Sequence, residues 1–122
     1  MFKVVYLTLT GNTKRLVKKI NAESIELNDS TVDIPIDDYF ILIVPSYEKD
    51  FTYIAYDFLS YEDNRKKCKG IVGCGNLNFG NLFCYSALDL SEKFNIPIIR
   101  NVEYSGNDKD IEIIQKEIDS IG

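Results

Sequence analysis

The sequence predicts an α/β fold in which helices cover both faces of a parallel β-sheet. Short apolar runs alternate with segments of helical periodicity, and short connections separate them. Two of the runs, residues 39–44 and 71–74, are apolar without alternation, as is typical of strands that are buried on both faces. Right-handed strand–helix–strand units make neighbouring strands parallel. With 122 residues, the chain is expected to form one domain, 1–122, with five strands.

The first predicted elements are short. Residues 2–7 form an apolar run that predicts a strand, and a helix is expected after residues 8–13. The apolar face of this helix consists of Leu16, Val17 and Ile20. Residues 24–27 predict a second strand, and the Asp-rich segment 28–38 is expected to be a polar connector.

The central strands have the clearest signals. Residues 39–44 predict a buried strand that stops at Pro45, because proline cannot donate to the ladder of a sheet. Residues 52–59 predict a helix. Its apolar face consists of Ile54, Ala55, Phe58 and Leu59. Residues 71–74 predict the next strand.

Three further elements complete the predicted fold. A helix follows in which Phe83, Ala87, Leu90 and Phe94 recur at helical spacing. Pro97 introduces a strand at residues 98–104. The last helix has one apolar stripe, which consists of Ile111, Ile114, Ile118 and Ile121.

Charge and composition exclude several classes of function. The chain has 14 basic and 19 acidic residues, a net charge of −5 and no basic stripe, so we expect no nucleic-acid partner. The absence of histidine rules out Ser–His and Cys–His nucleophile pairs and the commonest metal ligand. We therefore expect neither hydrolytic nor zinc chemistry, and no metal site.

Cysteine usage and hydropathy indicate the cellular compartment. Cys68, Cys74 and Cys84 are odd in number and have no C-x-x-C spacing, which fits reduced thiols in the core. No apolar run reaches the length of a signal peptide core or a membrane span. We expect a soluble cytoplasmic protein without a membrane partner.

The hexapeptide T-L-T-G-N-T at residues 8–13 is the most informative motif. Between a strand and a helix, its hydroxyls, its asparagine amide and the N–H groups of the first helical turn can converge on an anion. It lacks the Gly-Lys-Ser/Thr ending of a triphosphate loop and the three glycines of a dinucleotide turn. We interpret it as a site for one phosphate monoester, such as that of flavin mononucleotide (FMN). The alternative is a simple helix cap.

Three loops are expected to form one site. With the strand order 2-1-3-4-5, residues 8–13, 45–51 and 73–80 meet at the carboxyl edge of the sheet, where such sheets bind ligands. A flavin ring needs aromatic or apolar walls, for which Phe79 and Tyr47 are candidates. The alternatives are a core anchor for Phe79 and a solvent-facing aromatic for Tyr47. Gly75 and Asn76 could present backbone groups to the ring, or form a simple turn.

These loops resemble those of a known family. The motif at residues 8–13 resembles the flavodoxin phosphate loop, and G-N-L-N-F-G at residues 75–80, followed by Phe83 and Cys84, resembles the flavin loop of the NrdI family. The resemblance continues through Ser91, residues 95–98, residues 103–106 and Asp110. NrdI proteins are small flavodoxin-like partners of class Ib ribonucleotide reductase. The resemblance covers most of the chain in the right order.

The resemblance implies a fold and a function. The fold is a flavodoxin-like three-layer sandwich with a five-stranded parallel sheet in the order 2-1-3-4-5. The function is that of an FMN-binding redox protein that, when reduced, reacts with dioxygen. It thereby supplies the oxidant for assembling the dimanganese–tyrosyl radical cofactor of the class Ib ribonucleotide reductase small subunit. An unidentified flavin or flavodoxin reductase, or another electron donor, would reduce it. The flavin carries the chemistry, so no side chain need act as acid, base or nucleophile.

The expected cofactor-binding residues come from the three loops. They are Thr8, Thr10, Gly11, Asn12 and Thr13, then Pro45, Ser46 and Tyr47, and then Gly73, Cys74, Gly75, Asn76, Asn78, Phe79 and Gly80. The second loop departs from the family, because it reads S-Y-E-K-D-F where members often carry glycines. Its carboxylates would disfavour an anionic reduced flavin, although charge effects at exposed sites are small. The docking surface for the partner is expected to include Tyr47, Lys49, Asn76 and Asn78.

Two other functions are alternatives. A flavodoxin-type one-electron carrier would share the phosphate loop, but the short chain and the G-N-L-N-F-G loop argue against it. A non-flavin interaction module would keep the fold without the cofactor. Oxygen reactivity separates the first two functions, and a yellow purified protein excludes the third.

Overall fold

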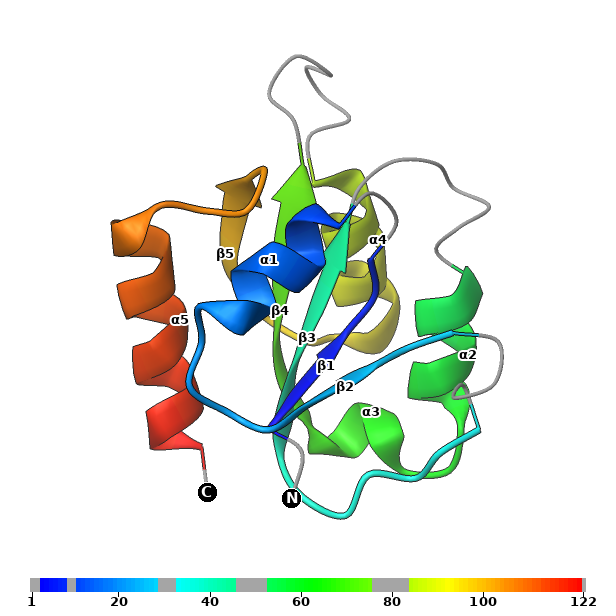
Figure 1. Ribbon diagram of the computed structural model, residues 1–122. Coiled ribbons are helices and arrows are strands. Elements are labelled where there is room, and N and C mark those ends of the chain that lie inside the picture. Colours follow the sequence, from blue (N-terminus) through cyan, green and yellow to red (C-terminus); the bar gives the residue numbers. More distant parts are fainter. Residues whose placement is uncertain (1–2, 9–10, 29–32, 46–52, 76–83, 122) are drawn as a thin grey trace.

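The computed structural model describes residues 3–8, 11–28, 33–45, 53–75 and 84–121. They form a five-stranded sheet with helices on both faces, the predicted α/β architecture (Figure 1). The strand order is β2-β1-β3-β4-β5, and each neighbouring pair is parallel. The predicted fold class and strand order are therefore confirmed.

The elements follow the predicted sequence order. The strands are β1 (Val4–Tyr6), β2 (Ser24–Glu26), β3 (Phe40–Pro45), β4 (Cys68–Gly75) and β5 (Ile98–Glu103). The helices are α1 (Asn12–Lys18), α2 (Tyr53–Ser60), α3 (Asn64–Lys67), α4 (Tyr85–Phe94) and α5 (Asp108–Ser120). Helix α3 has no counterpart in the prediction, because four residues are too few to show helical periodicity.

Several boundaries differ from the prediction. The largest difference is in β4, which begins three residues earlier than predicted, at Cys68. The exposed Lys69 and the side-chain-free Gly70 hide the start of this buried strand from a hydropathy pattern. Tyr39 lies outside β3 and is half-exposed, whereas Pro45 is its last residue and pairs with Cys74 of β4.

The ends of the other elements shift by one to three residues. β1 is shorter than residues 2–7, β2 ends before Leu27, and β5 ends before Tyr104. Ile121 caps α5 instead of lying within the helix. Shifts of this size are ordinary, because the ends of elements are set by caps and turns rather than by periodicity.

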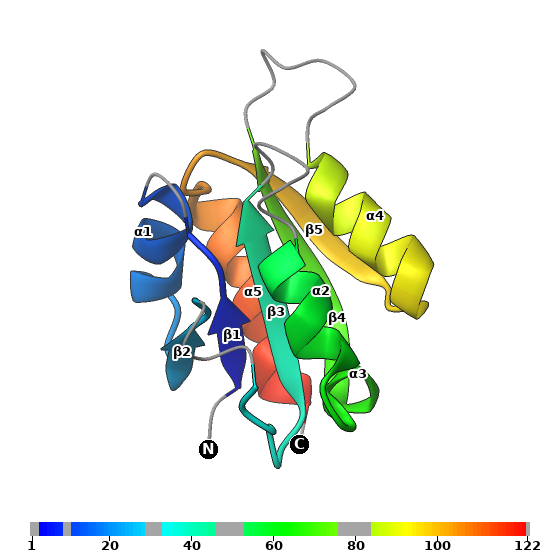
Figure 2. The same cartoon turned by 90° about the vertical axis from the view of Figure 1, so that its right-hand side faces the viewer.

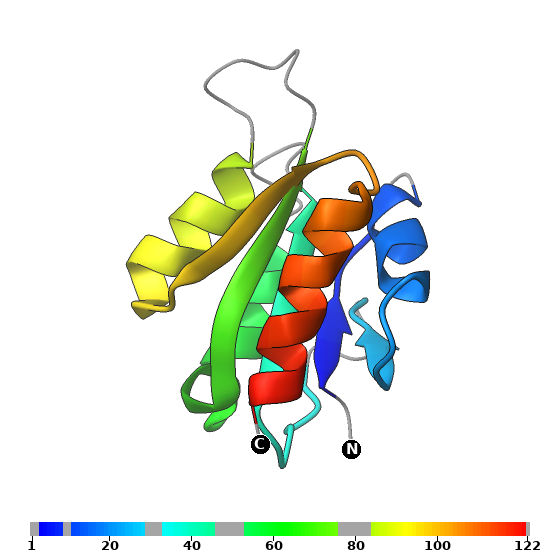
Figure 3. The same ribbon diagram turned by 90° about the vertical axis from the view of Figure 1, so that its left-hand side faces the viewer.

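Two apolar clusters fill the space between the layers. Helices α1 and α5 cover one face of the sheet, and α2 and α4 cover the other (Figures 2 and 3). The predicted apolar faces of α1 and α2 are buried, and Phe58 of α2 packs edge-to-face on Phe40 of β3 at 5.6 Å between ring centroids. Burying one such side chain contributes about 1.5–3 kcal/mol. This packing fixes the parallel strands so that their carboxyl ends share one edge.

Candidate functional site

The carboxyl ends of β1, β3, β4 and β5 lie along one edge of the sheet (Figure 1). Among the predicted site residues, those described at this edge are Thr8, Gly11, Asn12, Thr13, Pro45, Gly73, Cys74 and Gly75. The others lie outside the described residues: Thr10, Ser46, Tyr47, Asn76, Asn78, Phe79 and Gly80. The flavin walls Tyr47 and Phe79 therefore stay predictions.

The turn after β1 is closed by a local hydrogen bond. The Gly11 N–H donates to Thr8 Oγ1 at 3.2 Å, and the Arg15 N–H donates to the Gly11 carbonyl at 2.9 Å to begin α1. Gly11 is the N-cap residue and has a φ of 94°, in the left-handed region that glycine adopts without strain. Glycine offers no side-chain oxygen to the first helical turn, and this turn contains no acidic residue. Its N–H groups and the Thr8 hydroxyl suit an anion in both geometry and charge.

Asn12 and Thr13 occupy different environments at the start of α1. The Thr13 side chain is 1% exposed and hydrogen-bonds with the Cys74 thiol of β4. Thr13 thus joins α1 to the sheet through its side chain, which leaves its backbone N–H as its contribution to an anion site. Asn12 Oδ1 accepts a hydrogen bond from Arg15 Nη1 at 2.7 Å. This contact brings a positive charge to the turn, which the motif alone did not predict.

Gly73 allows β4 and α4 to approach each other closely. A Cβ atom at Gly73 would lie 2.7 Å from Asn101 Oδ1, 2.8 Å from Ala87 Cβ and 2.9 Å from Cys84 Cβ. Cys84 is the N-cap residue of α4, is buried and has a left-handed φ of 55°. Gly75, at the end of β4, and Cys84 therefore hold the two ends of the predicted flavin loop in place.

The two thiols at this edge are unreactive in acid–base terms. Burial raises the pKa of Cys74 to about 12; the hydrogen bond with Thr13 lowers it in part, and nearby Cys84 and Asp110 raise it. Burial likewise raises the pKa of Cys84 to about 12. All three cysteines are free and buried, as predicted. Since the thiolate is the nucleophile, these thiols are poor nucleophiles at neutral pH.

The corner between β5 and α5 also belongs to this edge. The Tyr104 N–H donates to the Gly75 carbonyl at 2.9 Å, and Tyr104 has a left-handed φ of 55°. Gly106 follows with a φ of 79°. Lys19, after the end of α1, places Nζ at 3.5 Å from both Ser105 Oγ and the Gly106 carbonyl. The corner thus contacts the predicted flavin loop on one side and α1 on the other.

A partly buried charge pair holds this corner. Asn107 Oδ1 accepts from the Asp110 N–H at 2.9 Å, and Asp110 Oδ2 accepts from the Asn107 N–H at 2.9 Å, which forms a capping box at the start of α5. Arg100 Nε of β5 donates to Asp110 Oδ1 at 2.5 Å. Sequence reasoning did not include this corner in the site. The Gly106-Asn107-x-x-Asp110 pattern, a helix-start signal, could have located it.

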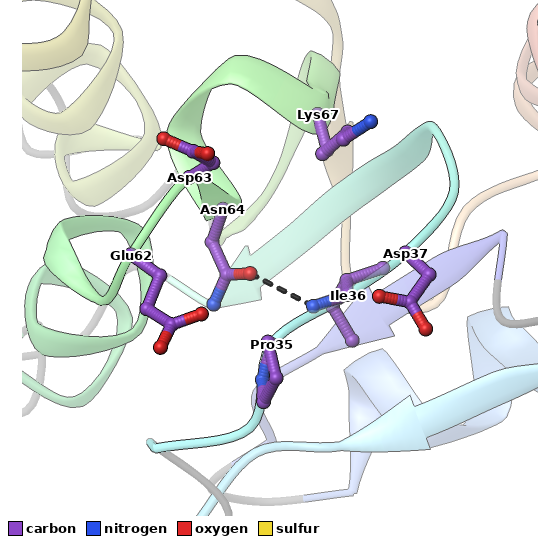
Figure 4. A pocket seen from close by; sticks show the side chains of 7 residues that line it. All are labelled: Pro35, Ile36, Asp37, Glu62, Asp63, Asn64 and Lys67. Carbon is purple, nitrogen blue, oxygen red and sulfur yellow. Dashed lines mark hydrogen bonds between the residues drawn. The ribbon is translucent and has the colours of Figure 1, made fainter.

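A hollow of about 160 Å³ lies at the opposite, amino edge of the sheet (Figure 4). It is lined by Pro35, Ile36, Asp37, Glu62, Asp63, Asn64 and Lys67. Pockets for cofactor-sized ligands have volumes of about 300–1,000 Å³. This hollow is therefore too small for a flavin, and the carboxyl edge remains the candidate site.

Among the residues that the structure describes, no group of three or more His, Cys, Asp or Glu side chains is arranged to hold a metal ion. Likewise, none of the described helices has the length and apolar character needed to cross a membrane.

Comparisons with known proteins agree on one family. The sequence profile described as "NrdI Flavodoxin like" matches residues 4–116. The chain is 30% identical to Protein NrdI of Mycoplasmopsis pulmonis, over 98% of this chain and 85% of the relative. It is 31% identical to Protein NrdI of Mesoplasma florum, over 93% of this chain and 80% of the relative. It is 27% identical to Protein NrdI of Bartonella henselae, over 95% of this chain and 92% of the relative.

A solved structure supports the fold. The chain superimposes on a short-chain flavodoxin associated with a bacterial microcompartment with a TM-score of 0.66 and 20% sequence identity. The match covers 98% of this chain and 95% of the flavodoxin. At this level of identity, the likeness shows a shared flavodoxin-type fold.

Proposed function

The chain belongs to the NrdI flavodoxin-like family, and from this premise we propose that it is an FMN-binding redox protein whose reduced form reacts with dioxygen. The oxidant formed serves to assemble the dimanganese–tyrosyl radical cofactor in the small subunit of a class Ib ribonucleotide reductase. The family match over residues 4–116 is the observation that carries the proposal. A flavin or flavodoxin reductase, or another donor, supplies the electrons.

The turn after β1 is proposed to hold the phosphate of FMN. Its donor set fits a phosphate monoester. The Thr8 oxygen accepts from the Gly11 N–H, which leaves the Thr8 hydroxyl proton to donate, and the N–H groups in the first turn of α1 are further donors. Thr10 and the backbone of Asn12 and Thr13 complete the set. Arg15, held by Asn12, adds a positive charge that favours the anion.

The carboxyl ends of β3 and β4 and the residues that follow them are proposed to hold the flavin ring. The proposed residues are Pro45, Ser46 and Tyr47, and Gly73, Cys74, Gly75, Asn76, Asn78, Phe79 and Gly80. When bound, FMN supplies the electron transfer to dioxygen. The protein binds and orients the cofactor and controls access of water and oxygen to it. The carbonyl of Gly75 is engaged with Tyr104, so the Tyr104 N–H helps to position the strand end next to the ring.

A single isosteric substitution tests the phosphate site. Asn12→Asp places a negative charge beside the proposed phosphate, and we expect FMN affinity to fall about tenfold, whereas the affinity for riboflavin, which has no phosphate, stays unchanged. The folded apo-protein should lose no stability, because an acidic residue is favourable in the first turn of a helix. Fluorescence titration measures both affinities. Asn21→Asp, beyond the other end of α1, is the matched control. Equal affinities of the parent for FMN and riboflavin would contradict the phosphate site.

Phe79→Ala tests the ring site. Loss of stacking and apolar contact should weaken FMN binding by about 1–3 kcal/mol and leave the apo-protein folded. Urea unfolding without flavin provides the control. An equal loss of apo-protein stability would identify Phe79 as a core residue instead.

Radical formation tests the function itself. The reduced protein is mixed with a dimanganese-loaded class Ib small subunit, oxygen is added, and tyrosyl radicals are counted by electron paramagnetic resonance. We expect radical yields well above those with a flavodoxin control. Yields at the control level, together with efficient electron delivery to a redox enzyme, would favour the one-electron carrier.

A further inference from the structure

The outward face of α1 consists of positive side chains. Thr13, Leu16, Val17 and Ile20 face the core and are buried. The exposed positions are Lys14, Arg15, Lys18 and Lys19, which we call the α1 face. Residues 11–22 contain no acidic residue. These cations do not form a continuous basic run in the sequence, because Leu16 and Val17 interrupt them. The helical spacing of i, i+1, i+4 and i+5 brings them onto one surface.

In the described part of the chain, Lys14 of the α1 face forms an ion pair. Lys14 Nζ lies 4.0 Å from Glu26 Oε1, and both side chains are well exposed. Arg15 and Lys19 contact neutral oxygens, those of Asn12, Ser105 and Gly106. The α1 face is therefore a region of net positive charge on a chain whose overall charge is −5.

The α1 face adjoins the candidate site through the corner between β5 and α5. Figure 3 shows this corner beside α1, and the contacts of Lys19 with Ser105 and Gly106 join the two. The corner exposes Tyr104, whose side chain is 47% accessible although its backbone is held at Gly75. Tyrosine and arginine are the residue types that most often dominate binding at protein interfaces.

We propose that the α1 face and Tyr104 together dock an acidic surface of the protein that receives the oxidant. The inference rests on the proposed function and names the charge of the partner's surface. An acidic patch brought within the Debye length of about 8 Å at physiological salt is attracted by the α1 face. A long polyanion such as nucleic acid would also meet the negative remainder of the molecule, so the charge distribution favours a local patch on a protein.

Matched charge reversals test the docking surface. The double variant Lys14→Glu/Lys18→Glu reverses two charges of the α1 face. Arg65→Glu/Lys66→Glu makes the same change in net charge on α3, at the amino edge. Both FMN-loaded proteins are passed over an immobilised dimanganese-loaded small subunit at about 0.05 M and 0.2 M salt, where the Debye length differs about twofold. The measured quantities are the association and dissociation rate constants.

The two pairs should behave differently. We expect the α1 pair to lower the association rate constant at least tenfold at low salt, with a smaller effect at high salt, and the α3 pair to change it by less than about twofold. Tyr104→Ala should raise the dissociation rate constant about tenfold, because a buried aromatic contact would be lost. Circular dichroism and FMN titration verify that each variant is folded and loaded.

Each remaining outcome has a distinct meaning. If the two pairs associate at equal rates, the α1 face does not dock the partner and the inference is wrong, while the proposed function stands. If the α1 pair instead abolishes retention by duplex DNA and leaves partner association intact, the face serves nucleic acid and the inference is again overturned. If the parent neither associates with the small subunit nor forms radicals, the proposed function fails as well.

Discussion

The connections between strands and helices are held in place differently at the two edges of the sheet. At the carboxyl edge, tight turns at Gly11 and Gly106 redirect the chain. Non-glycine residues with left-handed φ occur at both edges, Cys84 and Tyr104 at this one and Glu62 and Asn95 at the amino edge. Hydrogen bonds such as Gly11 N–H to Thr8 Oγ1 close these turns while leaving backbone donors at the surface. At the amino edge, residues 33–39 and α3 are joined by the side chain of Asn64, which faces inward (Figure 4).

Both the oxygen and the nitrogen of the Asn64 side-chain amide form hydrogen bonds to the backbone at the amino edge. Its Oδ1 accepts from the Ile36 N–H at 2.9 Å, and its Nδ2 donates to the carbonyls of Ile34 at 3.0 Å and Phe58 at 2.9 Å. The residue is 1% exposed. The amino edge thus contributes stability, and the carboxyl edge contributes the candidate site. Substitutions at each edge test this difference.

The largest expected effect is that of Asn64→Ala. It leaves the Ile36 N–H and the Ile34 carbonyl without a side-chain partner, whereas the Phe58 carbonyl still accepts from the Tyr61 N–H. We expect the free energy of unfolding to fall by about 4 kcal/mol. FMN affinity of the folded protein should stay unchanged, because Asn64 is at the other edge. Gln115→Ala is the matched control. The Gln115 side chain makes a similar pair of hydrogen bonds to the backbone of Asn21, but these bonds are exposed to solvent. Its loss should lower the free energy of unfolding by less than about 1 kcal/mol. Urea unfolding and FMN titration measure the two effects. A large loss of FMN affinity in Asn64→Ala would show that the edges are coupled.

Alkaline pH should destabilise the protein through thiols at both edges. Burial raises the pKa of Cys68, at the amino edge, to about 12, as it does for Cys84 at the carboxyl edge. The unfolded thiol, with a pKa of about 8.5, loses its proton first as pH rises. The free energy of unfolding should therefore fall between pH 9 and pH 12, by about 1.4 kcal/mol per pH unit and thiol.

Single variants separate the contributions of the two thiols. The free energy of unfolding of each protein is compared between pH 9 and pH 11. This drop should be about 3 kcal/mol smaller in Cys68→Ala, and likewise in Cys84→Ala, than in the parent. Urea unfolding across this pH range measures it. If the free energy of unfolding depends less on pH in Cys68→Ala only, the carboxyl edge opens locally before the protein unfolds. The two edges would then differ in local stability as well.

Two glycines of β4 offer a third test. Gly73→Ala would overlap Cys84 and Ala87 of the α4 region, and we expect a loss of about 2 kcal/mol in stability together with weaker FMN binding, because the end of the flavin loop is displaced. Gly70→Ala is the control toward the amino edge, where the new Cβ would lie 2.3 Å from Cδ1 and 2.5 Å from Cγ1 of Ile99. Its loss of stability should be comparable, whereas its FMN affinity should equal that of the parent. Equal FMN affinities for the two variants would argue against a role of Gly73 in the site.

The fold could be predicted because its signals are local and periodic. The buried strands at residues 39–44 and 71–74, with amphipathic helices between them, determine a parallel sheet whatever the details of the loops. Helix α3 could not be predicted in this way. It depends on Asn64, whose partners Ile34 and Ile36 are distant in the sequence.

The candidate site likewise combines local contacts, which a motif predicts, with contacts between residues distant in the sequence. The bond between Thr8 and Gly11 spans three residues, and a motif predicts such a turn. Thr13 is different, because its side chain bonds to Cys74 of β4 and its role depends on how helix and sheet pack. Tyr104 likewise enters the site only through Gly75, on the neighbouring strand. Contacts of this kind follow from tertiary structure and have no local signature.

The smallest expected effect comes from relieving backbone strain at each edge. Glu62, at the amino edge, has a φ of 47°, and a non-glycine residue in this region costs about 1–2 kcal/mol. Glu62→Gly should raise the free energy of unfolding by about 0.5 kcal/mol after the entropic cost of glycine, whereas Glu62→Ala should bring no gain. Neither variant should alter FMN affinity or association with the small subunit.

Tyr104→Gly is the counterpart at the carboxyl edge. Its φ of 55° predicts a similar gain of about 0.5 kcal/mol in apo-protein stability. Loss of the exposed ring should at the same time weaken association with the small subunit. Thermal unfolding and association rates measured on the same samples would show both changes. If Tyr104→Gly stabilises the protein and partner association is unaffected, the strain at this corner is no more functional than that at Glu62. A gain in stability together with weaker association would indicate that strain is kept at the carboxyl edge because the tyrosine there is used.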